Sequence, residues 1–279
     1  MPRISVIIPC YNYARFLPEA VESVVRQTYP GVETIIVNDG SPDNTVEIAE
    51  ELIAKFPGHR IRLINQENLG ISAARNTGIE VSACDYYLPL DADDILLPGC
   101  LERLLDVTEE DPAADFAYPW SERFGNDPGL DVRGEFTRKV LLVNQGPSCV
   151  ALIKKSAWRR AGGYKTVMTM GYEDWEFYHS LFEAGCKGVV VPEVLFLYRR
   201  HGPSRADSAN RHILEVTRRI KLLHPRMYEP FLCGLSVHLA RAVIWLKSWT
   251  RDPVMHYIYV KFPGLHSKLR HIKYSLFVR

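Results

Sequence analysis

The first 90 residues repeat one local pattern, in which a short apolar run is followed by a loop and then by apolar residues at helical spacing. The apolar runs lie at 4–8, 34–37, 61–64 and 86–90, and the helical stretches lie at 16–27, 46–56 and 72–80. Strands that alternate with helices through short loops favour a mostly parallel sheet, covered by helices on both faces and joined by right-handed crossovers. The predicted fold class is therefore a doubly wound α/β sheet.

The loops that follow parallel strands gather at one edge of a sheet, where open α/β sheets bind ligands. Tyr11, Asp39, Arg75 and Asp91 are expected to become neighbours at this edge, although they are far apart in the sequence. No Gly-x-Gly-x-x-Gly follows the first strand, and no Gly-Lys-Ser occurs anywhere. A dinucleotide site and a P-loop are therefore disfavoured, and a phosphate bound here would need a metal to neutralise its charge.

The fourth apolar run ends in three carboxylates, Asp91, Asp93 and Asp94. Residues two apart on extended chain point the same way, so Asp91 and Asp93 are placed to share one hard cation, or a cation and a ribose. The residues also allow a plainer interpretation, a solvated acidic turn that caps a helix beginning near Leu97. A bound divalent cation would relieve the charge repulsion between these neighbouring carboxylates.

The formal net charge of +1 conceals an uneven distribution. Residues 206–279 hold 13 of the 34 Lys and Arg but 4 of the 33 Asp and Glu, so this tail carries +9 and the remainder −8. Helices are expected at 212–224, 230–249 and near 265–276, where apolar residues share one face and basic residues the rest. A basic amphipathic helix is typical of binding to an anionic membrane surface. Docking on the body or on a partner chain explains the pattern equally well, and nucleic acid is not an expected partner.

The six cysteines are scattered, without a Cys-x-x-Cys pair or a zinc-type cluster. Because the N-terminus also enters a strand directly, without a signal peptide, the sequence favours the reducing cytoplasm. No apolar run reaches the roughly 18 residues of a membrane helix. The longest candidate, 231–246, is interrupted by His238 and Arg241, so any contact with the inner face of a membrane is expected to be peripheral.

Seven motifs in a fixed order identify a family resemblance. Four lie at 5–12 (Ser-Val-Ile-Ile-Pro-Cys-Tyr-Asn), 35–41 (Ile-Ile-Val-Asn-Asp-Gly-Ser), 68–78 (Asn-Leu-Gly-Ile-Ser-Ala-Ala-Arg-Asn-Thr-Gly) and 90–94 (Leu-Asp-Ala-Asp-Asp), and three follow at 162–164, 173–175 and 198–201. Over about residues 4–205 this order resembles the signatures of glycosyltransferase family two. The resemblance implies a GT-A fold, with a nucleotide-sugar-binding and catalytic domain at 1–205 and a basic helical extension at 206–279.

The resemblance also implies roles for residues at the sheet edge. Asp39 would accept the ring N–H of uracil, which would lie between Pro9 and Tyr11. Asp91 would lie near the ribose. Asp93 would ligate Mn²⁺ or Mg²⁺, the metal that bridges the diphosphate. Asn38 is a departure, because relatives commonly carry a second Asp there. His201 is similar to the family's late histidine, which completes the metal or diphosphate site. The full expected nucleotide-binding set is Pro9, Tyr11, Asp39, Asn68, Arg75, Asp91 and Ala92.

The motif at 173–175 is expected to carry the chemistry. Asp174 would remove the proton from the acceptor hydroxyl, and Glu173 and Trp175 would face the sugars. The residues alone leave other interpretations open, because acids in the first turn of a helix are stabilised by its dipole and Trp175 equally suits a core. With one such carboxylate and no evident nucleophile, a single displacement with inversion at the anomeric carbon is the economical mechanism.

The sequence therefore predicts an inverting, metal-dependent glycosyltransferase that moves a sugar from a nucleotide donor, with UDP the expected nucleotide. The expected acceptor is a hydroxyl of a glycan or lipid-linked molecule in polysaccharide or glycolipid synthesis. A sugar-nucleotide nucleotidyltransferase is one alternative, although it normally carries a Gly-rich, basic loop after the first strand. A non-catalytic nucleotide- or glycan-binding module is the other.

Overall fold

The computed structural model of the chain describes residues 3–143, 146–201 and 209–232. Contacts divide the chain into two units, Met1–Met227 and Tyr228–Arg279, and the fold described here is that of the first. This unit extends beyond the boundary expected at residue 205, because buried His224 bonds to Glu176 and Glu183 inside it. The basic helix expected near 265–276, and the part of the 230–249 helix beyond 232, lie outside the described residues.

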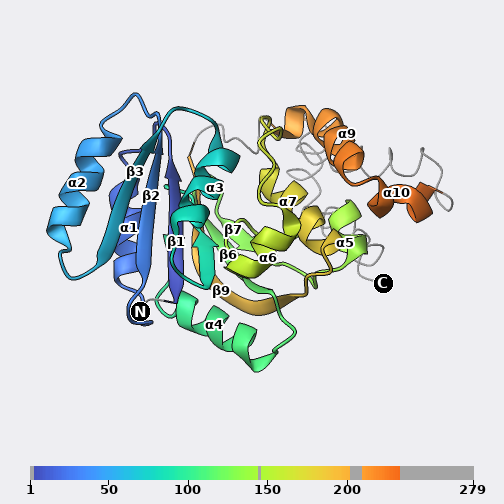
Figure 1. The fold of residues 1–279 in the computed structure, drawn as a ribbon, viewed down its shortest axis with the longest axis horizontal. Helices are drawn as coiled ribbons and strands as arrows, with labels where there is room; N and C mark the ends of the chain where they lie inside the picture. Colours follow the sequence, from blue (N-terminus) through green and yellow to red (C-terminus); the bar gives the residue numbers. More distant parts are fainter. Residues whose placement is uncertain (1–2, 144–145, 202–208, 233–279) are drawn as a thin grey trace, which may run out of the picture. The chain divides into compact units, whose positions relative to one another are not determined.

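The first four strands form a parallel sheet in the order β3-β2-β1-β4. Figure 1 shows β3, β2 and β1 side by side in this order. β1 places Val6 beside Thr34 and Leu88, so the three β-branched or leucine-rich runs are in register. All residues of β1, β2 and β4 are buried, as expected of strands covered on both faces. The strands span β1 Ile4–Cys10, β2 Glu33–Asp39, β3 Arg60–Gln66 and β4 Tyr86–Pro89.

Beyond β4 the same sheet becomes mixed, continuing as β8-β6-β9-β5 with β7 beside β6. β8 is antiparallel to both β4 and β6, whereas β6 and β9 are parallel to each other. The predicted α/β class is confirmed, with its parallel part confined mainly to the N-terminal half. The strands of this half span β5 Ile95–Leu96, β6 Phe116–Gly125, β7 Gly129–Asp131, β8 Leu152–Lys154 and β9 Gly188–Arg200.

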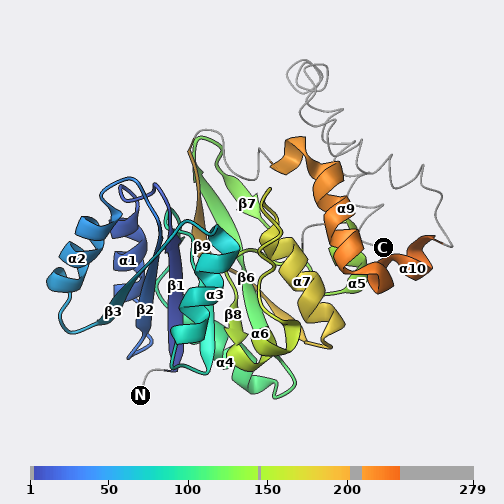
Figure 2. The same ribbon diagram turned by 45° about the horizontal axis from the view of Figure 1, so that its top comes forward.

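Helices cover both faces of the sheet. α1 (Leu17–Val25), α2 (Thr45–Lys55) and α4 (Cys100–Glu110) share one apolar core with alternate residues of the strands. α3 (Ile71–Val81) lies on the opposite face of β1 and β2 (Figure 2). Its Gly78 permits this approach, because a Cβ there would lie 2.5 Å from Ile7 Cγ2.

The remaining helices lie after residue 137 in the chain. α6 (Lys155–Ala161) packs against α7 (Glu173–Glu183), and α5 (Arg138–Val143) also contacts α7. α9 spans Ile213–Leu223 and α10 spans Pro225–Leu232. At the start of α2 the Asn44 side chain makes no capping hydrogen bond, and the Asp43 carboxylate accepts the Thr45 N–H at 3.2 Å.

Candidate active site

The carboxyl ends of the parallel strands bring the expected nucleotide-binding residues to one edge of the sheet. Pro9 is buried in β1, and Tyr11 follows this strand with 48% of its surface exposed. An aromatic ring exposed beside a strand end is available for stacking on a planar ligand. Ala92, in the acidic loop after β4, is buried.

Asp39 ends β2 and holds the loop that leads into α3. Its carboxylate accepts hydrogen bonds from the Leu69 and Gly70 N–H groups, both at 2.9 Å, and from the Gln66 side-chain amide at 2.7 Å. The adjoining Gly40 has a φ of +65°, and a Cβ there would lie 2.7 Å from the backbone nitrogen of Asn68. Because a carboxylate offers about four acceptor positions, Asp39 retains room for one further donor.

Arg75 joins the acidic loop to α7. Its guanidinium, 1% exposed, donates to Asp91 Oδ1 at 2.7 Å and to Glu173 Oε1 at 2.9 Å. Burial alone would lower the pKa of Arg75, but the charges of Asp91 and Glu173 outweigh it and hold this pKa well above its usual value. Two carboxylates therefore already compensate the positive charge of Arg75, which was expected to contact the nucleotide.

Asp93 and His201 form a direct pair across the edge. The Asp93 Oδ2 atom and the His201 Nε2 atom are 2.9 Å apart, and the imidazole packs on Phe16 at a centroid separation of 4.5 Å. Burial and repulsion from Asp91 raise the pKa of Asp93, while the hydrogen bond with His201 opposes this rise. The structure thus brings together the two residues expected to hold the metal, bonded to one another.

A second group of potential ligand atoms lies beside this pair. Ligand atoms of Asp91, Asp94 and Cys149 all lie within 4.8 Å of one another. Asp94 is fully buried, and its Oδ1 accepts the Arg199 N–H at 2.9 Å, while its Oδ2 has no hydrogen-bond partner among the described residues. A buried carboxylate oxygen without a partner is costly, and burial raises the pKa of Asp94 well above its usual value, with repulsion from Asp93 and Asp91 adding to the effect. This orphaned oxygen among converging donors fits a divalent cation.

Sequence reasoning missed Cys149 and the separate position of Asp94. Cys149 lies between Ser148, whose carbonyl accepts the Tyr178 hydroxyl at 2.7 Å, and the residues that enter β8. Its approach to the acidic loop depends on the pairing of β8 with β4. No local pattern signals such a contact, because the two segments are joined only by the sheet.

Asp174 lies in the first turn of α7, next to the Glu173 held by Arg75. It is partly exposed, and its Oδ1 accepts the N–H of Trp175 at 2.8 Å. Burial against the protein and repulsion from Glu173 raise the pKa of Asp174 to about 6. The helix begins after Tyr172, a non-glycine residue with a φ of +61°. Such strain is uncommon and costs on the order of 1–3 kcal/mol.

Trp175 lies in the core rather than facing a ligand. Its side chain is 6% exposed, its indole N–H donates to the Leu141 carbonyl at 2.8 Å, and its ring meets Tyr172 and His179 edge-on. The structure therefore favours the core interpretation that the sequence left open. Glu173 and Trp175 are neighbours in sequence, but Glu173 turns to the edge and Trp175 turns to α5.

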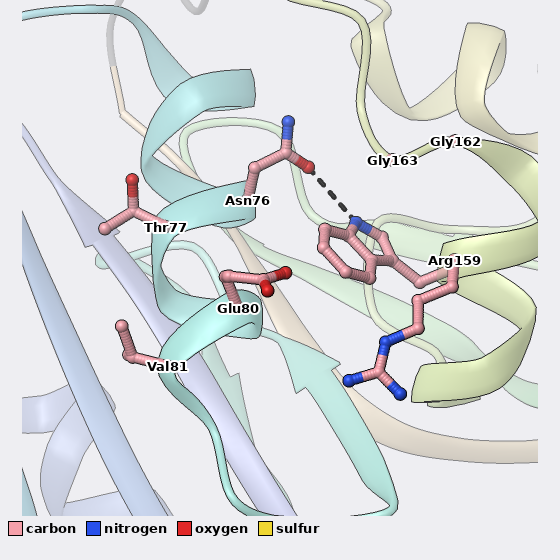
Figure 3. Close-up of a pocket in the computed structure, with 8 residues that line it drawn as sticks. Asn76, Thr77, Glu80, Val81, Arg159, Gly162 and Gly163 are labelled. Atoms are coloured by element: carbon pink, nitrogen blue, oxygen red, sulfur yellow. Dashed lines mark hydrogen bonds between the residues drawn. The ribbon is translucent and has the colours of Figure 1, made fainter.

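A cavity of about 600 Å³ lies between α3 and α6, separate from the acidic loop (Figure 3). Asn76 links the two sides of the cavity. The Asn76 Oδ1 atom accepts the Trp158 indole N–H at 3.1 Å and the Tyr164 N–H at 2.9 Å. These bonds fix α6 against α3 and place Tyr164 over Arg75, whose guanidinium carbon is 5.4 Å from the ring centroid. The residues that line the cavity thus hold Tyr164 against Arg75, but they do not contribute the carboxylates of the acidic loop. Its lining is Asn76, Thr77, Glu80, Val81, Trp158, Arg159, Gly162 and Gly163.

Comparison with known proteins establishes the class that this edge defines. The model of glycosyl transferase family 2 matches residues 5–167, which is more than half of the 279-residue chain. The chain belongs to this family, and it is a glycosyltransferase with a GT-A fold, as its motifs predicted.

Curated relatives match this chain over different lengths. Glycosyltransferase GlyG of Streptococcus pneumoniae is 38% identical over 266 residues, which cover 85% of this chain and 84% of the relative. Two others, from Bacillus subtilis and Escherichia coli, match over 110 and 109 residues, and the chain spans about a third of the length of each (31%).

Solved structures share the fold at low sequence identity. TarS 1–349 of Staphylococcus aureus, solved with UDP-GlcNAc, has a TM-score of 0.66 at 16% identity and covers 94% of this chain and 76% of its own. The mannosyltransferase PcManGT of Pyrobaculum calidifontis, solved with GDP-Man and Mn²⁺, has a TM-score of 0.61 at 18% identity, with coverage of 92% and 82%.

Proposed function

We propose that this glycosyltransferase moves a sugar from a nucleotide donor, with UDP as the preferred nucleotide, to a hydroxyl acceptor with inversion at the anomeric carbon. The observation that carries this proposal is the buried Asp91–Arg75–Glu173 bridge, which joins the nucleotide edge to the helix that bears Asp174. A bridge of this kind sets the distance between a donor at the edge and a base on α7. The UDP and UDP-GlcNAc complexes of TarS support the choice of nucleotide.

The base of the nucleotide is proposed to lie between Pro9 and Tyr11. The exposed Tyr11 ring supplies a stacking surface, and the remaining acceptor position of Asp39 receives the ring N–H of uracil. The same carboxylate fixes the loop of Asn68, so base recognition and loop position depend on one residue. The second carboxylate oxygen of Asp91 and the backbone at Ala92 are proposed to lie near the ribose.

A divalent cation, Mn²⁺ or Mg²⁺, is proposed at the acidic loop, where it would offset the charge of the diphosphate and of the departing nucleotide. Asp93 and His201 are the ligand pair implied by the family resemblance. Their mutual hydrogen bond of 2.9 Å keeps both side chains oriented toward one point. The Mn²⁺ in the PcManGT structure supports a metal of this type.

Asp174 is proposed to act as the general base. It takes the proton of the acceptor hydroxyl as that oxygen bonds to the anomeric carbon and the bond between this carbon and the diphosphate oxygen breaks. A pKa of about 6, caused by burial and the neighbouring Glu173, leaves the carboxylate mostly ionised at pH 7 yet more basic than an exposed Asp. General-base assistance of this kind contributes on the order of 10²–10⁴ in rate.

The acceptor is proposed to be a glycan or lipid-linked hydroxyl at an anionic membrane surface. Within the described residues, no helix has the length and apolarity to cross a membrane. α9 and the residue before its cap expose Arg211, Arg218 and Lys221 together with Leu214 and Leu222, the latter two 66% and 71% exposed. Cations with exposed leucines suit peripheral binding to anionic lipid. The cytoplasmic placement expected from the sequence stays a prediction.

Melting temperatures in the presence of nucleotides test the donor assignment, because a ligand that binds the native state raises the melting temperature. UDP with Mn²⁺ should raise it more than the adenosine and guanosine diphosphates do. Asp174→Asn should keep this UDP response and lose turnover. A nucleotidyltransferase would instead respond to a nucleoside triphosphate and a sugar phosphate. A chain that binds glycan or nucleotide but never releases UDP from a donor panel would be a binding module.

A further inference from the structure

A second cavity lies at the amino ends of the parallel strands, at the edge of the sheet opposite Tyr11 and Asp91. The Arg3 carbonyl, directly before β1, accepts the Tyr86 N–H at the start of β4. Tyr86 in turn pairs with Lys154, where β8 runs antiparallel to β4. The register of the sheet therefore brings three segments that are far apart in the sequence to one cavity, with a volume of about 460 Å³.

The charges that line this cavity are mostly positive, and we call it the basic cavity. Four cationic side chains and one carboxylate line it: Arg3, Lys154, Lys155, Arg159 and Asp85. Arg3 is paired with Glu109, but the other three cations form no ion pair with any residue that the structure describes. Neighbouring cations repel one another, and an anion bound between them would relieve this repulsion.

Lys155 is the most buried of these cations, with 7% of its surface exposed. Its ammonium donates to the Glu80 and Ser82 carbonyls at the end of α3, at 2.9 and 2.6 Å. These carbonyls compensate part of its charge, as expected for a cation at a helix C-terminus. Because an ammonium has three donors, one N–H remains beyond these two bonds. Burial lowers the pKa of Lys155, and repulsion from Arg159 adds to the effect. A bound anion would oppose both causes.

We infer that the basic cavity binds a phosphate group, carried by a lipid headgroup or by a phosphate-bearing glycan. The planar guanidinium of Arg159 suits two oxygens of one phosphate. Lys154 and Lys155 supply further positive charge, and the hydroxyl of the exposed Ser156 supplies a neutral donor. The volume of about 460 Å³ lies within the range of about 300–1,000 Å³ that is typical of small-molecule sites. The inference does not depend on the nucleotide or the metal, because these residues lie away from the nucleotide edge.

Isothermal titration of the full chain with inorganic phosphate tests the site. EDTA is present, so that no divalent cation attracts phosphate to the acidic loop. The wild type should bind phosphate saturably. Arg159→Gln should weaken this binding about tenfold, because it removes a hydrogen bond between charged groups. Asp85→Asn should strengthen it, because it removes the carboxylate that repels an anion. Both side chains are exposed, so neither change disturbs the core.

Arg15→Gln is the matched control for the loss of an arginine. Arg15 is exposed, and its guanidinium carbon lies 4.5 Å from the centroid of the Phe16 ring, in the loop after β1. Its removal should leave phosphate binding unchanged. Arg159→Gln should also keep the full rise in melting temperature that UDP with Mn²⁺ produces, because the basic cavity and the nucleotide edge are separate.

Vesicles identify the molecule that carries the phosphate. If it is a lipid headgroup, vesicles containing phosphatidic acid should compete with inorganic phosphate, whereas vesicles of phosphatidylcholine alone should not. Equal phosphate binding with and without phosphatidic acid assigns the cavity to a phosphate-bearing glycan, and either result supports a phosphate site. No saturable binding, or binding that falls in Arg15→Gln and is unchanged in Arg159→Gln, overturns the inference and leaves the proposed glycosyl transfer intact.

Discussion

Arg75 on α3 donates a hydrogen bond of 2.9 Å to Glu173 at the start of α7, although 98 residues separate them in the chain. Both side chains are buried, and the same guanidinium reaches Asp91 at 2.7 Å. Removing one partner of a buried charge pair leaves the other uncompensated, which costs on the order of 3–5 kcal/mol. The acidic loop after β4 and the start of α7 are therefore energetically connected through one side chain on α3.

Arg75→Met is expected to lower both stability and activity, because it leaves the buried Glu173 and the partly buried Asp91 without their cation. The free energy of unfolding should fall by about 3 kcal/mol. The triple variant Arg75→Met, Asp91→Asn, Glu173→Gln removes all three charges and should recover much of this loss without restoring turnover. Denaturant unfolding measures the first effect. Equal stability of Arg75→Met and the wild type would contradict the bridge.

Turnover is expected to fall on the acidic side with an apparent pKa near 6. Only the ionised Asp174 can accept the hydroxyl proton, and burial with Glu173 repulsion raises the pKa of Asp174 to about 6. Glu173→Gln removes the repulsion, so the acidic limb of the kcat profile should move to lower pH. Glu19→Gln, an exposed carboxylate paired with Arg199, is the control and should leave the limb in place. A limb unmoved by Glu173→Gln would exclude Asp174 as the titrating group.

Tyr11→Ala is expected to weaken UDP binding without affecting stability. The ring is 48% exposed, so its loss removes little packing, whereas stacking on a base is worth about 1–3 kcal/mol. That corresponds to roughly a 5- to 150-fold higher Kd. Tyr11→Phe keeps the ring and should bind nearly as the wild type does, as isothermal titration would show. Equal affinity in the alanine variant would place the base elsewhere.

The hydrogen bonds that join His224, at the end of α9, to Glu176 and Glu183 of α7 are expected to weaken as the pH rises. Burial lowers the pKa of His224, but its hydrogen bonds with Glu176 and Glu183 outweigh burial and raise this pKa above the usual value. The stabilisation is thus fully present below about pH 6.5 and is lost as the pH rises through the higher folded-state pKa. His224→Gln should lower the melting temperature most at acidic pH. A deficit that stays constant from about pH 5.5 to about pH 9, well below and well above the usual His pKa of about 6.5, would indicate packing alone.

The strand–helix repeats of the first 90 residues were predictable because each is coded locally by apolar periodicity and turn residues. β6, the ten-residue strand Phe116–Gly125, was not predicted. Its sequence contains Pro119 and Trp120, and the ladder with β9 shifts register at these residues, so neither alternation nor a continuous apolar run marks it. Irregular strands are specified by their neighbours rather than by their own pattern.

The elements that carry the candidate residues were predictable, but the pairing of these residues was not. The motifs placed Asp39 at the end of β2, Arg75 within α3 and Asp174 in the first turn of α7, because these elements follow from local signals. The sequence could not reveal that Arg75 is compensated by two carboxylates, or that Asp94 rather than Asp93 lies beside Cys149. Such contacts arise only when distant segments pack, and they change which side chains remain available to a ligand.

The most direct measurement is the anomalous diffraction of a crystal grown with UDP and Mn²⁺. The proposed function predicts a manganese peak within bonding distance of carboxylates in the 91–94 loop and of the UDP diphosphate, with the uracil beside Tyr11 and Asp39. A manganese-free edge with UDP bound elsewhere, for example in the cavity beside Trp158, would contradict it.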